Sequence, residues 1–577
     1  MLRIHEIKLG LDESLDALPD KIRKKLNQPQ LKIQSFSIFK ESVDARNKED
    51  IKFVYSLDFQ VKDESALLKN ATKLKMEQVK VYAEINSHLT DKDQSSMNNK
   101  VHPAVNSNAN SSENSPYRPV IVGFGPCGMF SALRLAELGY RPIVLERGKA
   151  LDDRAKDVQD FWSEGILNPE SNVAFGEGGA GAFSDGKLTT QIKDLRVRKV
   201  LEELVRAGGP ADILYKQKPH IGTDILRSVV VEIRKRIIAY GGEVRFESKL
   251  SGISMDEASG KNGQRTLSLK INEQEELVTQ SLILAIGHSA RDTFHMLHEA
   301  GLEMAQKPFS IGVRVEHPQK IIDEAQYGSH FAHPRLGAAD YKLSHHCQDG
   351  RGVYTFCMCP GGLVIGAASE AGCLVTNGMS YHSRAADNAN SALLVDVRTE
   401  DFPSSHPLAG IAFQRQWERE AFVLGGSNYR APAQKMGDFL AGNSESRRVL
   451  AGNSESRQVL AGNSESGQGA VKASFKPGVR FTDISKCLPD FALRAFKEAI
   501  PALGKKLYGF DDAEAILTAI ETRSSSPVRI LRDGDFCGSI FGIYPAGEGA
   551  GYAGGIISAA VDGLKAAEAV HASLENR

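Results

Sequence analysis

The sequence has little of what would place it in several common classes of protein. Its 577 residues include seven cysteines, an odd number at scattered spacings, which argues against a disulfide framework and favours a reducing compartment. Lys and Arg total 71 against 72 Asp and Glu, so the basic excess of a dedicated nucleic-acid binder is missing. No apolar run is long enough to span a membrane, and the first ten residues carry charges in place of an apolar leader. We therefore expect a cytoplasmic protein without a membrane partner.

What the sequence does contain is typical of a large globular protein. Hydrophobic residues make up 41% and charged residues 25% of the chain, and this length predicts about three or four domains. The alternation of strand-like and helix-like patterns predicts a mixed α/β fold. Glycine is abundant, with 53 residues, and the clusters that these glycines form carry the functional argument.

The first 86 residues are predicted to form a small N-terminal α/β domain. Apolar residues alternate in three segments and recur at helical spacing in two others. Nothing in this domain resembles a catalytic site, so a docking or scaffolding role is the simpler interpretation. The predicted strands span 2–9, 31–39 and 51–61, and the predicted helices span 12–26 and 63–74.

Two segments are too polar to form a core of their own. Residues 87–116 are rich in Ser, Asn, Asp and Lys and are predicted to be a disordered linker. Residues 439–469 repeat a ten-residue unit that begins Leu-Ala-Gly-Asn-Ser-Glu-Ser. A solenoid needs longer units that share an apolar core, so we interpret the repeat as a duplicated surface loop.

The first glycine cluster has the spacing of a dinucleotide-binding loop. A predicted strand over 119–124 runs into Gly123-Phe124-Gly125-Pro126-Cys127-Gly128, and a helix, a second strand over 142–145 and Glu146 follow. The three glycines permit a tight turn, close approach of the pyrophosphate and close helix packing, while the helix N-terminus attracts phosphate. Glu146, 18 residues after Gly128, can accept both ribose hydroxyls, which disfavours NADP and leaves FAD and NAD open.

Three further glycine-rich segments follow. A buried strand in 281–290 ends in Ala-Ile-Gly-His, and 540–549 contains Gly547-Glu548, shortly before a predicted helix over 554–570. The loop 168–187 has five glycines between residues 176 and 186, which suits a loop lying against a planar cofactor.

These segments resemble the two-domain FAD-dependent oxidoreductases, in which one strand ends in Ala-Thr-Gly and the last in Gly-Asp. Here Ile286 replaces the threonine, and Glu548 replaces the aspartate with one more methylene. Nearly the whole chain closely resembles a bacterial family of FAD-dependent dehydrogenase-like proteins that also has the N-terminal domain. The resemblance implies FAD as the cofactor and a Rossmann-like fold for the domain that binds it. The implied boundaries are 117–306 and 537–577 for the FAD-binding domain and 307–536 for an inserted α+β substrate or cap domain.

The motifs and the resemblance together mark the residues expected to contact FAD. The segment 241–250 is similar to the strand whose backbone meets the adenine, and the helix at 554–570 would direct its positive end toward the flavin O2. The expected cofactor-binding residues are Gly123, Gly125, Pro126, Gly128, Glu146, Arg147, Gly178, Gly179, Gly181, Lys187, Leu250, Gly287, Gly547, Glu548, Gly554 and Gly555.

The candidate catalytic residues are Lys187, Arg314, His317 and Arg523. An arginine that faces a flavin often binds a carboxylate or carbonyl substrate, although a salt bridge is the better explanation for each one singly. Cys357-Met-Cys359 is a CxC pair, either a dithiol relay or two buried structural thiols, and the second interpretation is favoured. No metal site is expected, because His345, His346 and Cys347 do not have the spacing of a standard zinc site.

The sequence thus predicts an FAD-dependent oxidoreductase that exchanges a hydride at flavin N5 with an unidentified small-molecule substrate. The insertion has no second GxGxxG with a following acid, so a separate NADH domain is not expected. The sequence leaves three electron sources open: the substrate itself, a transiently bound NAD(P)H and a protein donor. Two alternatives stay open: a flavoprotein associated with RNA, as in tRNA modification, and a non-catalytic flavin-binding protein. The neutral charge balance argues against a nucleic-acid partner.

Overall fold

The computed structural model describes residues 1–68, 75–78, 117–256, 265–442 and 471–575, which fall into two compact units. The predicted linker lies outside the described residues, and so do residues 443–470, which hold most of the ten-residue repeat. Within the described ranges, no helix is both long enough and apolar enough to cross a membrane.

The first unit is built around an antiparallel sheet with the strand order β2-β3-β1-β4. Besides the described residues of 1–110, this unit includes the segments Ala211–Pro219 and Tyr327–Leu336. Leu336 belongs to the same apolar core as Tyr55. Its elements are β1 (Leu2–Gly10), α1 (Leu18–Leu26), β2 (Ser35–Asp44), β3 (Lys52–Gln60), α2 (Glu64–Leu68) and β4 (Met76–Gln78).

Helix α1 starts later than the sequence pattern suggested. The periodicity predicted a helix from residue 12, but a short 3-10 turn, Leu15–Ala17, comes first and is capped by the Ser14 hydroxyl. Proline is favoured in the first turn of a helix because the missing N–H has no partner there, and a proline stands in the first turn of α1. Leu18, Ile22 and Leu26 then form the buried face of α1.

The second unit contains a parallel sheet with the strand order β23-β11-β5-β6-β7. The three central strands are fully apolar and buried, as a parallel sheet covered on both faces requires. The strand, glycine loop, helix and strand predicted around Gly123 are all present. The strands are β5 (Val120–Val122), β6 (Ile143–Leu145), β7 (Glu243–Arg245), β11 (Leu282–Leu284) and β23 (Ile543–Pro545).

The single strand predicted over 241–250 was wrong. Two strands occupy this region, and they belong to different sheets: β7 ends at Arg245, and β8 (Leu250–Asp256) pairs with β9 (Thr266–Ile271) and β10 (Glu275–Thr279). Glu247 between them has a φ of 52°, in the left-handed region that interrupts a strand.

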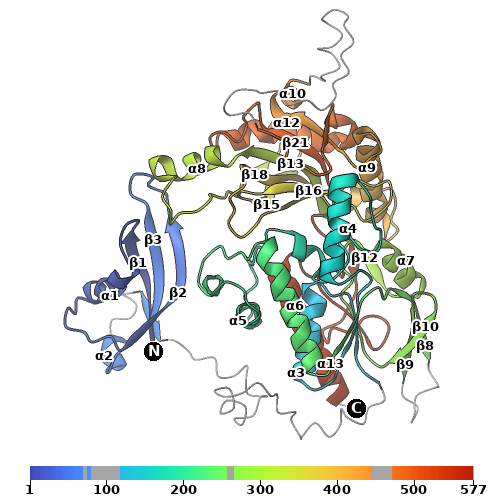
Figure 1. The fold of residues 1–577 in the computed structure, drawn as a ribbon, viewed down its shortest axis with the longest axis horizontal. Coiled ribbons are helices and arrows are strands. Elements are labelled where there is room, and N and C mark those ends of the chain that lie inside the picture. The colour runs from blue at the N-terminus through green and yellow to red at the C-terminus, as the bar shows by residue number, and fades with distance from the viewer. Residues whose placement is uncertain (69–74, 79–116, 257–264, 443–470, 576–577) are drawn as a thin grey trace, which may run out of the picture. The chain divides into compact units, whose positions relative to one another are not determined.

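Two helices from opposite ends of the second unit's sequence pack side by side (Figure 1). Helix α3 (Pro126–Glu137) and helix α13 (Ile556–Glu575) lie close together at Gly563, where a Cβ would lie 2.2 Å from the Cys127 carbonyl oxygen. The other helices around this region are α4 (Leu151–Glu164), α5 (Arg196–Arg206), α6 (Thr223–Ala239) and α7 (Arg291–Glu299).

The same unit holds a seven-stranded sheet with the order β14-β15-β18-β13-β21-β19-β20, antiparallel except for the pair β19–β20. Its strands are β13 (Phe309–Pro318), β14 (Ser344–His346), β15 (Gly352–Cys359), β18 (Asn388–Val397), β19 (Ala431–Lys435), β20 (Val479–Phe481) and β21 (Ile516–Glu521). Two small ribbons pair β12 (Met304–Gln306) with β22 (Val528–Ile530) and β16 (Leu363–Gly366) with β17 (Thr376–Met379). The remaining helices are α8 (Gln319–Tyr327), α9 (Ala409–Gly425), α10 (Met436–Ala441) and α12 (Asp490–Gly504).

The prediction of a mixed α/β fold is confirmed, and the described residues form both parallel and antiparallel sheets. The boundaries of the FAD-binding and cap domains stay predictions, because residues of both lie in the second unit.

Candidate functional site

Four of the predicted cofactor-binding segments end at one edge of the parallel sheet. Gly123, Glu146, Gly287 and Gly547 each follow within three residues of the carboxyl end of β5, β6, β11 or β23. Because parallel strands all end at the same edge, the fold gathers these segments where open α/β sheets bind their ligands.

The three glycines of the first cluster have different surroundings. A Cβ on Gly123, which has a φ of 98°, would lie 2.4 Å from the Ala285 carbonyl oxygen, and one on Gly128 would lie 1.9 Å from the Gly123 oxygen. Gly125 has an ordinary φ of −75°, and a Cβ there would have a single neighbour, the Gly179 Cα, at 3.8 Å. The outer glycines therefore allow protein packing, whereas Gly125 borders space that a pyrophosphate can occupy.

The predicted glycine loop lies against the N-termini of two helices. A Cβ on Gly181 would lie 3.7 Å from Pro126, in the first turn of α3, and 3.6 Å from Ile556, the first residue of α13. Gly125 is the N-cap of α3, and no side chain of the described residues caps that helix. Its first turn can therefore receive an anion, as the N-termini of such helices commonly do.

Open space borders three more of the predicted glycines, whereas Gly178 and Gly547 are packed against side chains. No atom of the described residues lies within 4 Å of a Cβ built on Gly287, Gly554 or Gly555. Gly125, the start of α13 and the turn beyond β11 thus each border open space, and we call these three edges together the glycine cradle. This cradle fits a long, partly planar dinucleotide such as FAD.

Glu146 is buried and binds three backbone amides. Its carboxylate accepts hydrogen bonds from the N–H groups of Phe124 at 2.8 Å, Gly148 at 2.9 Å and Gly176 at 2.8 Å. A carboxylate offers about four acceptor positions, so one remains for a ribose hydroxyl. The side chain predicted to bind ribose also holds three loops of the site together.

Arg147 is engaged in ion pairs. Its guanidinium binds both carboxylate oxygens of Asp292, at 2.8 and 2.9 Å, and one oxygen of Glu170 at 2.8 Å, while Lys249 contacts the same two acids. Burial alone would raise the pKa of Asp292, but the hydrogen bonds from Arg147 hold that pKa well below its usual range. Leu250 follows Lys249 and is buried in the apolar core of the unit.

A buried arginine that the sequence analysis missed organises the glycine-rich loop. The Arg154 guanidinium on α4 donates four hydrogen bonds to carbonyl oxygens of this loop, and burial lowers its pKa to about 10. A Cβ on Gly176, which has a φ of 120°, would lie 2.4 Å from the Arg154 Cδ. In the sequence, Arg154 is one of several charges on an amphipathic helix, which gave no signal of this role. The accepting carbonyls belong to Asn172, Val173, Glu177 and Gly179.

Titratable groups gather beyond the ends of β11 and β23. Burial raises the pKa of Glu548 to about 7, although Lys307 opposes the shift. The His288 Nε2 lies 4.0 Å from a Glu548 oxygen, and burial together with nearby arginines lowers the pKa of His288 to about 3. A neutral imidazole therefore stands beside a carboxyl group that can gain or lose a proton near neutral pH, which is the property of a general acid or base.

Arg314, a predicted substrate-binding cation, is buried on β13, and all five of its N–H groups are engaged. Two bind the carboxylate of Glu521, one binds the Cys357 carbonyl oxygen at 2.9 Å, and the others bind Asn377 at 3.1 Å and Asn390 at 3.2 Å. These contacts favour a positioning role over contact with a substrate.

The structure does not place the His317 side chain beside that of Arg314. Successive residues of a strand face opposite sides of the sheet, so His317 and Arg314, three apart on β13, point away from each other. The His317 Nε2 pairs with the Phe510 carbonyl oxygen at 2.7 Å, and burial lowers the pKa of this histidine.

Arg523 belongs to a buried ion-pair network. It binds both carboxylate oxygens of Glu418, at 3.1 and 2.9 Å, and Arg291 binds the same carboxylate at 2.7 and 2.8 Å. Burial would raise the pKa of Glu418, but the two arginines hold it well below its usual range. Arg523 also donates to the Ser289 hydroxyl at 3.1 Å, which ties it to the turn beyond β11.

Lys187 lies at the end of the glycine-rich loop and forms an isolated bridge with His220. Its positive charge lowers the pKa of Cys357, which comes from β15 of the seven-stranded sheet. Among the four predicted catalytic residues, Lys187 and Arg314 therefore both act on Cys357, whereas His317 and Arg523 lie in other surroundings.

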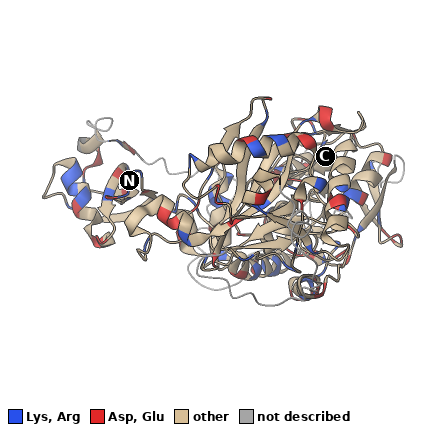
Figure 2. Ribbon diagram, turned by 90° about the horizontal axis from the view of Figure 1, so that it is seen from above, with Lys and Arg blue, Asp and Glu red and all other residues tan. Residues whose placement is uncertain are grey.

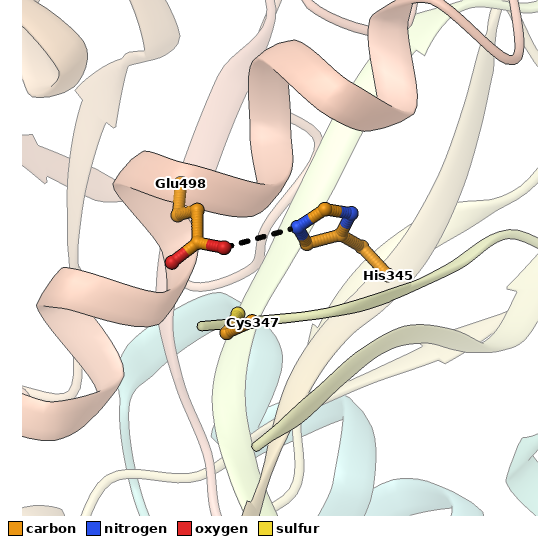
Figure 3. A group of neighbouring side chains, drawn as sticks. All are labelled: His345, Cys347 and Glu498. Carbon is orange, nitrogen blue, oxygen red and sulfur yellow. Dashed lines mark hydrogen bonds and ion pairs between the residues drawn. The ribbon is translucent and has the colours of Figure 1, made fainter. Parts of the chain in front are cut away.

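Among the residues that the structure describes, two groups of side chains have the composition of a metal site. His345, Cys347 and Glu498 converge between β14 and α12 (Figure 3), with the His345 Nε2 3.3 Å from a Glu498 oxygen. Glu498 also accepts the Gln348 N–H at 3.0 Å, and burial raises the pKa of the Cys347 thiol to about 11. The group offers three ligands, one fewer than a structural zinc site. The second group, Glu370, Cys373 and Glu418, has its carboxylates paired with arginines.

Charges of both signs are interspersed along the described elements (Figure 2). Helix α1 shows this arrangement locally, with an acidic residue in its first turn and three basic residues in its last. The expectation of no nucleic-acid partner stays a prediction.

Comparison with known proteins identifies the cofactor. Residues 308–524 match the family described as FAD-dependent protein, C-terminal domain-like, and residues 1–60 match a domain of unknown function, DUF8436. The first match confirms FAD as the cofactor. A protein of Clostridium beijerinckii, described as uncharacterised, is 48% identical over 569 residues, which cover 98% of either chain.

Solved structures resemble the chain only distantly. The halogenase PltM in complex with phloroglucinol and FAD aligns over 80% of this chain and 71% of its own, with 12% identity and a TM-score of 0.35. OxyS, an anhydrotetracycline hydroxylase from Streptomyces rimosus, aligns over 50% of this chain and 47% of its own, with 16% identity and a TM-score of 0.25. The aligned region thus spans about half of the hydroxylase. At these TM-scores the likeness carries no argument about function.

Proposed function

This chain belongs to the same protein family as the Clostridium beijerinckii protein, and we propose that it is an FAD-dependent oxidoreductase acting on a small-molecule substrate. The observation that carries the proposal is the set of titratable groups at the end of the glycine cradle. Glu548 follows β23 and His288 follows β11, so both stand beside the strand ends that border the cradle.

The glycine cradle would hold the cofactor. Gly125 and the first turn of α3 would receive the pyrophosphate, Glu146 would accept a ribose hydroxyl, and Gly287 and Gly555 would border the flavin. When bound, FAD supplies hydride transfer at N5, while the protein supplies orientation and electrostatics.

The chain's own residues would move the proton that accompanies hydride transfer. Glu548, with its pKa raised to about 7 by burial, can exchange that proton near neutral pH. His288 stays neutral because its pKa is lowered to about 3, so it would orient the Glu548 carboxyl group or a substrate hydroxyl without adding charge. Lys187 would contribute a cation that attracts an anionic or carbonyl substrate.

Anaerobic reduction of the flavin tests this proposal. The purified holoprotein is titrated with NADH, NADPH, small thiols and a metabolite pool while the flavin absorbance is followed. Rapid bleaching by one donor class is expected, and Glu548→Gln should slow it by about 100-fold or more, the usual effect of removing a general acid or base.

The control is Glu498→Gln, a change of the same chemistry at a carboxylate on α12, which should leave the reduction rate unchanged. Flavin that resists every donor would contradict the proposal and favour the non-catalytic alternative. Bleaching that is equally fast in Glu548→Gln would refute the role of this carboxyl group.

A further inference from the structure

Two cysteines of the seven-stranded sheet lie at an irregularity in strand β15. The pairing of β15 with β18 joins Phe356 to Ala392 and Cys359 to Asn390, so β15 has one extra residue in this interval. Cys357 lies in this bulge with a φ of 44°, a left-handed conformation that a non-glycine residue rarely adopts. Bulges of this kind re-aim side chains and are frequent next to active sites.

The surrounding structure holds the bulge in place. Arg314 donates a hydrogen bond to the Cys357 carbonyl oxygen at 2.9 Å, and the Cys359 thiol donates to the same oxygen at 3.3 Å. Space for the guanidinium exists because residue 378 is glycine: a Cβ there would lie 2.4 Å from the Arg314 Nη1. Strained backbone persists only where its surroundings determine it, and Arg314 provides that constraint as a positioning residue.

The two thiols differ in acidity. Hydrogen bonding from Cys359 lowers the pKa of Cys357 to about 5, with burial opposing and the charges of Lys187 and Arg314 adding to the effect. The same coupling and burial raise the pKa of Cys359. The acidic groups that face Cys357 are Asp185, Glu521 and Glu548, and each disfavours the thiolate.

Four of the other cysteines have a raised thiol pKa, in contrast to Cys357. Burial raises the pKa of the Cys127, Cys347, Cys373 and Cys487 thiols, as expected of inert structural cysteines. Cys357 is partly exposed, whereas Cys359 is fully buried. A partly exposed cysteine of lowered pKa followed by a buried thiol is the arrangement of an attacking and a resolving cysteine.

We propose that Cys357 and Cys359 form a redox-active dithiol that reduces an organic disulfide, with Cys357 as the attacking and Cys359 as the resolving residue. The Cys357 thiolate attacks one sulfur of the disulfide, whose S–S bond breaks and releases a thiolate. Cys359 then attacks the Cys357 Sγ, releases the second half of the disulfide, and gives its proton to one of the leaving groups. The cysteine pair loses two electrons, and the two released thiols gain them.

This chemistry goes beyond the proposed function, because thiol–disulfide exchange requires no cofactor. The test uses reduced holoprotein, oxidised glutathione as the probe, and peptide mass spectrometry. Wild-type protein should form the Cys357–Cys359 disulfide and release two glutathione thiols. Cys359→Ser should retain one glutathione on Cys357, and Cys357→Ser should form neither product. Cys537→Ser removes another partly exposed cysteine and should behave as wild type.

The pH dependence of alkylation gives a second readout. The rate at which iodoacetamide modifies Cys357 should reach half of its maximum near pH 5, and Lys187→Met and Cys359→Ala should move this midpoint upward. An ordinary thiol has its midpoint near about pH 8.5. A midpoint there in folded, flavin-loaded wild-type protein, or glutathione at other cysteines only, would overturn the proposal.

The two proposals can fail separately. A Gly125→Val protein that has lost its flavin should still form the Cys357–Cys359 disulfide. If the dithiol reacts but no donor bleaches the flavin of the wild-type protein, the oxidoreductase proposal alone fails.

Discussion

The substitution Gly125→Val separates cofactor binding from folding. Gly125 has an unstrained φ of −75°, and a Cβ there meets only the Gly179 Cα at 3.8 Å, so the fold has room for the new side chain. Valine is a poorer N-cap than glycine, which should reduce the stability of the apoprotein by about 1 kcal/mol. The valine methyl groups would occupy the space next to the α3 N-terminus that the pyrophosphate needs.

The measurable consequence is the gain in stability on adding FAD. A ligand at 100 times its Kd stabilises the folded state by about 2.7 kcal/mol. Wild-type protein should therefore unfold at a clearly higher temperature with FAD than without it, and in Gly125→Val this difference should vanish while the apoprotein Tm falls only slightly. The assay is thermal unfolding of flavin-stripped protein with and without added FAD, together with the flavin content as purified.

Two other glycines serve as references. Gly534 lies in an exposed turn, has no atom of the described chain within 4 Å of its built Cβ, and belongs to no glycine cluster, so Gly534→Val should keep the full FAD-dependent gain. Gly128→Val places a Cβ 1.9 Å from the Gly123 oxygen and should destabilise the apoprotein itself, by about 3 kcal/mol or more. Full flavin content and an unchanged gain in Gly125→Val would refute the assignment of this loop to the pyrophosphate.

Three further predictions concern buried charges. The lysine of Arg154→Lys cannot reproduce four hydrogen bonds to the glycine-rich loop, so the variant should have a lower Tm and a lower flavin occupancy. The expected loss in stability is about 3 kcal/mol or more. A flavin occupancy equal to that of the wild type would contradict the role of Arg154 in shaping the loop. Glu418→Gln leaves Arg523 buried without its ion pair and leaves Arg291 paired with Glu370 alone, and urea unfolding should show a loss of about 3–5 kcal/mol. Because the pKa of Glu418 is depressed in the folded state, its contribution is present above the ordinary glutamate pKa and is lost as pH falls through the lower folded value. The stability of wild-type protein should therefore fall more steeply than that of Glu418→Gln as the pH is lowered from about 5, and parallel curves would refute the shift.

Local chemistry determined the glycine turn after β5 and much of the secondary structure. The strand, glycine turn and helix around Gly123 are specified by residues within about 25 positions, because apolar runs, glycines with special backbone angles and helix periodicity are all local signals. The same holds for β1 and for α13, although their bounds differ by one or a few residues from those predicted. Where a local signal was overridden, as at Glu247, a single left-handed residue divided one predicted strand into two.

Only the tertiary structure decided what the charged residues do. Arg314 and Arg523 resemble substrate-binding arginines in the sequence, yet their partners lie up to 207 and 234 residues away. Arg154 holds the glycine-rich loop from a helix that looks ordinary in the sequence. The same holds in part for Cys357: hydrogen bonding from Cys359 in its own strand lowers its pKa most, and the charges of Lys187 and Arg314 from other elements lower this pKa further. Burial and pairing with residues distant in the sequence set the protonation state and the role of these charged and titratable side chains. Neither produces a periodic pattern that can be recognised in the amino-acid sequence.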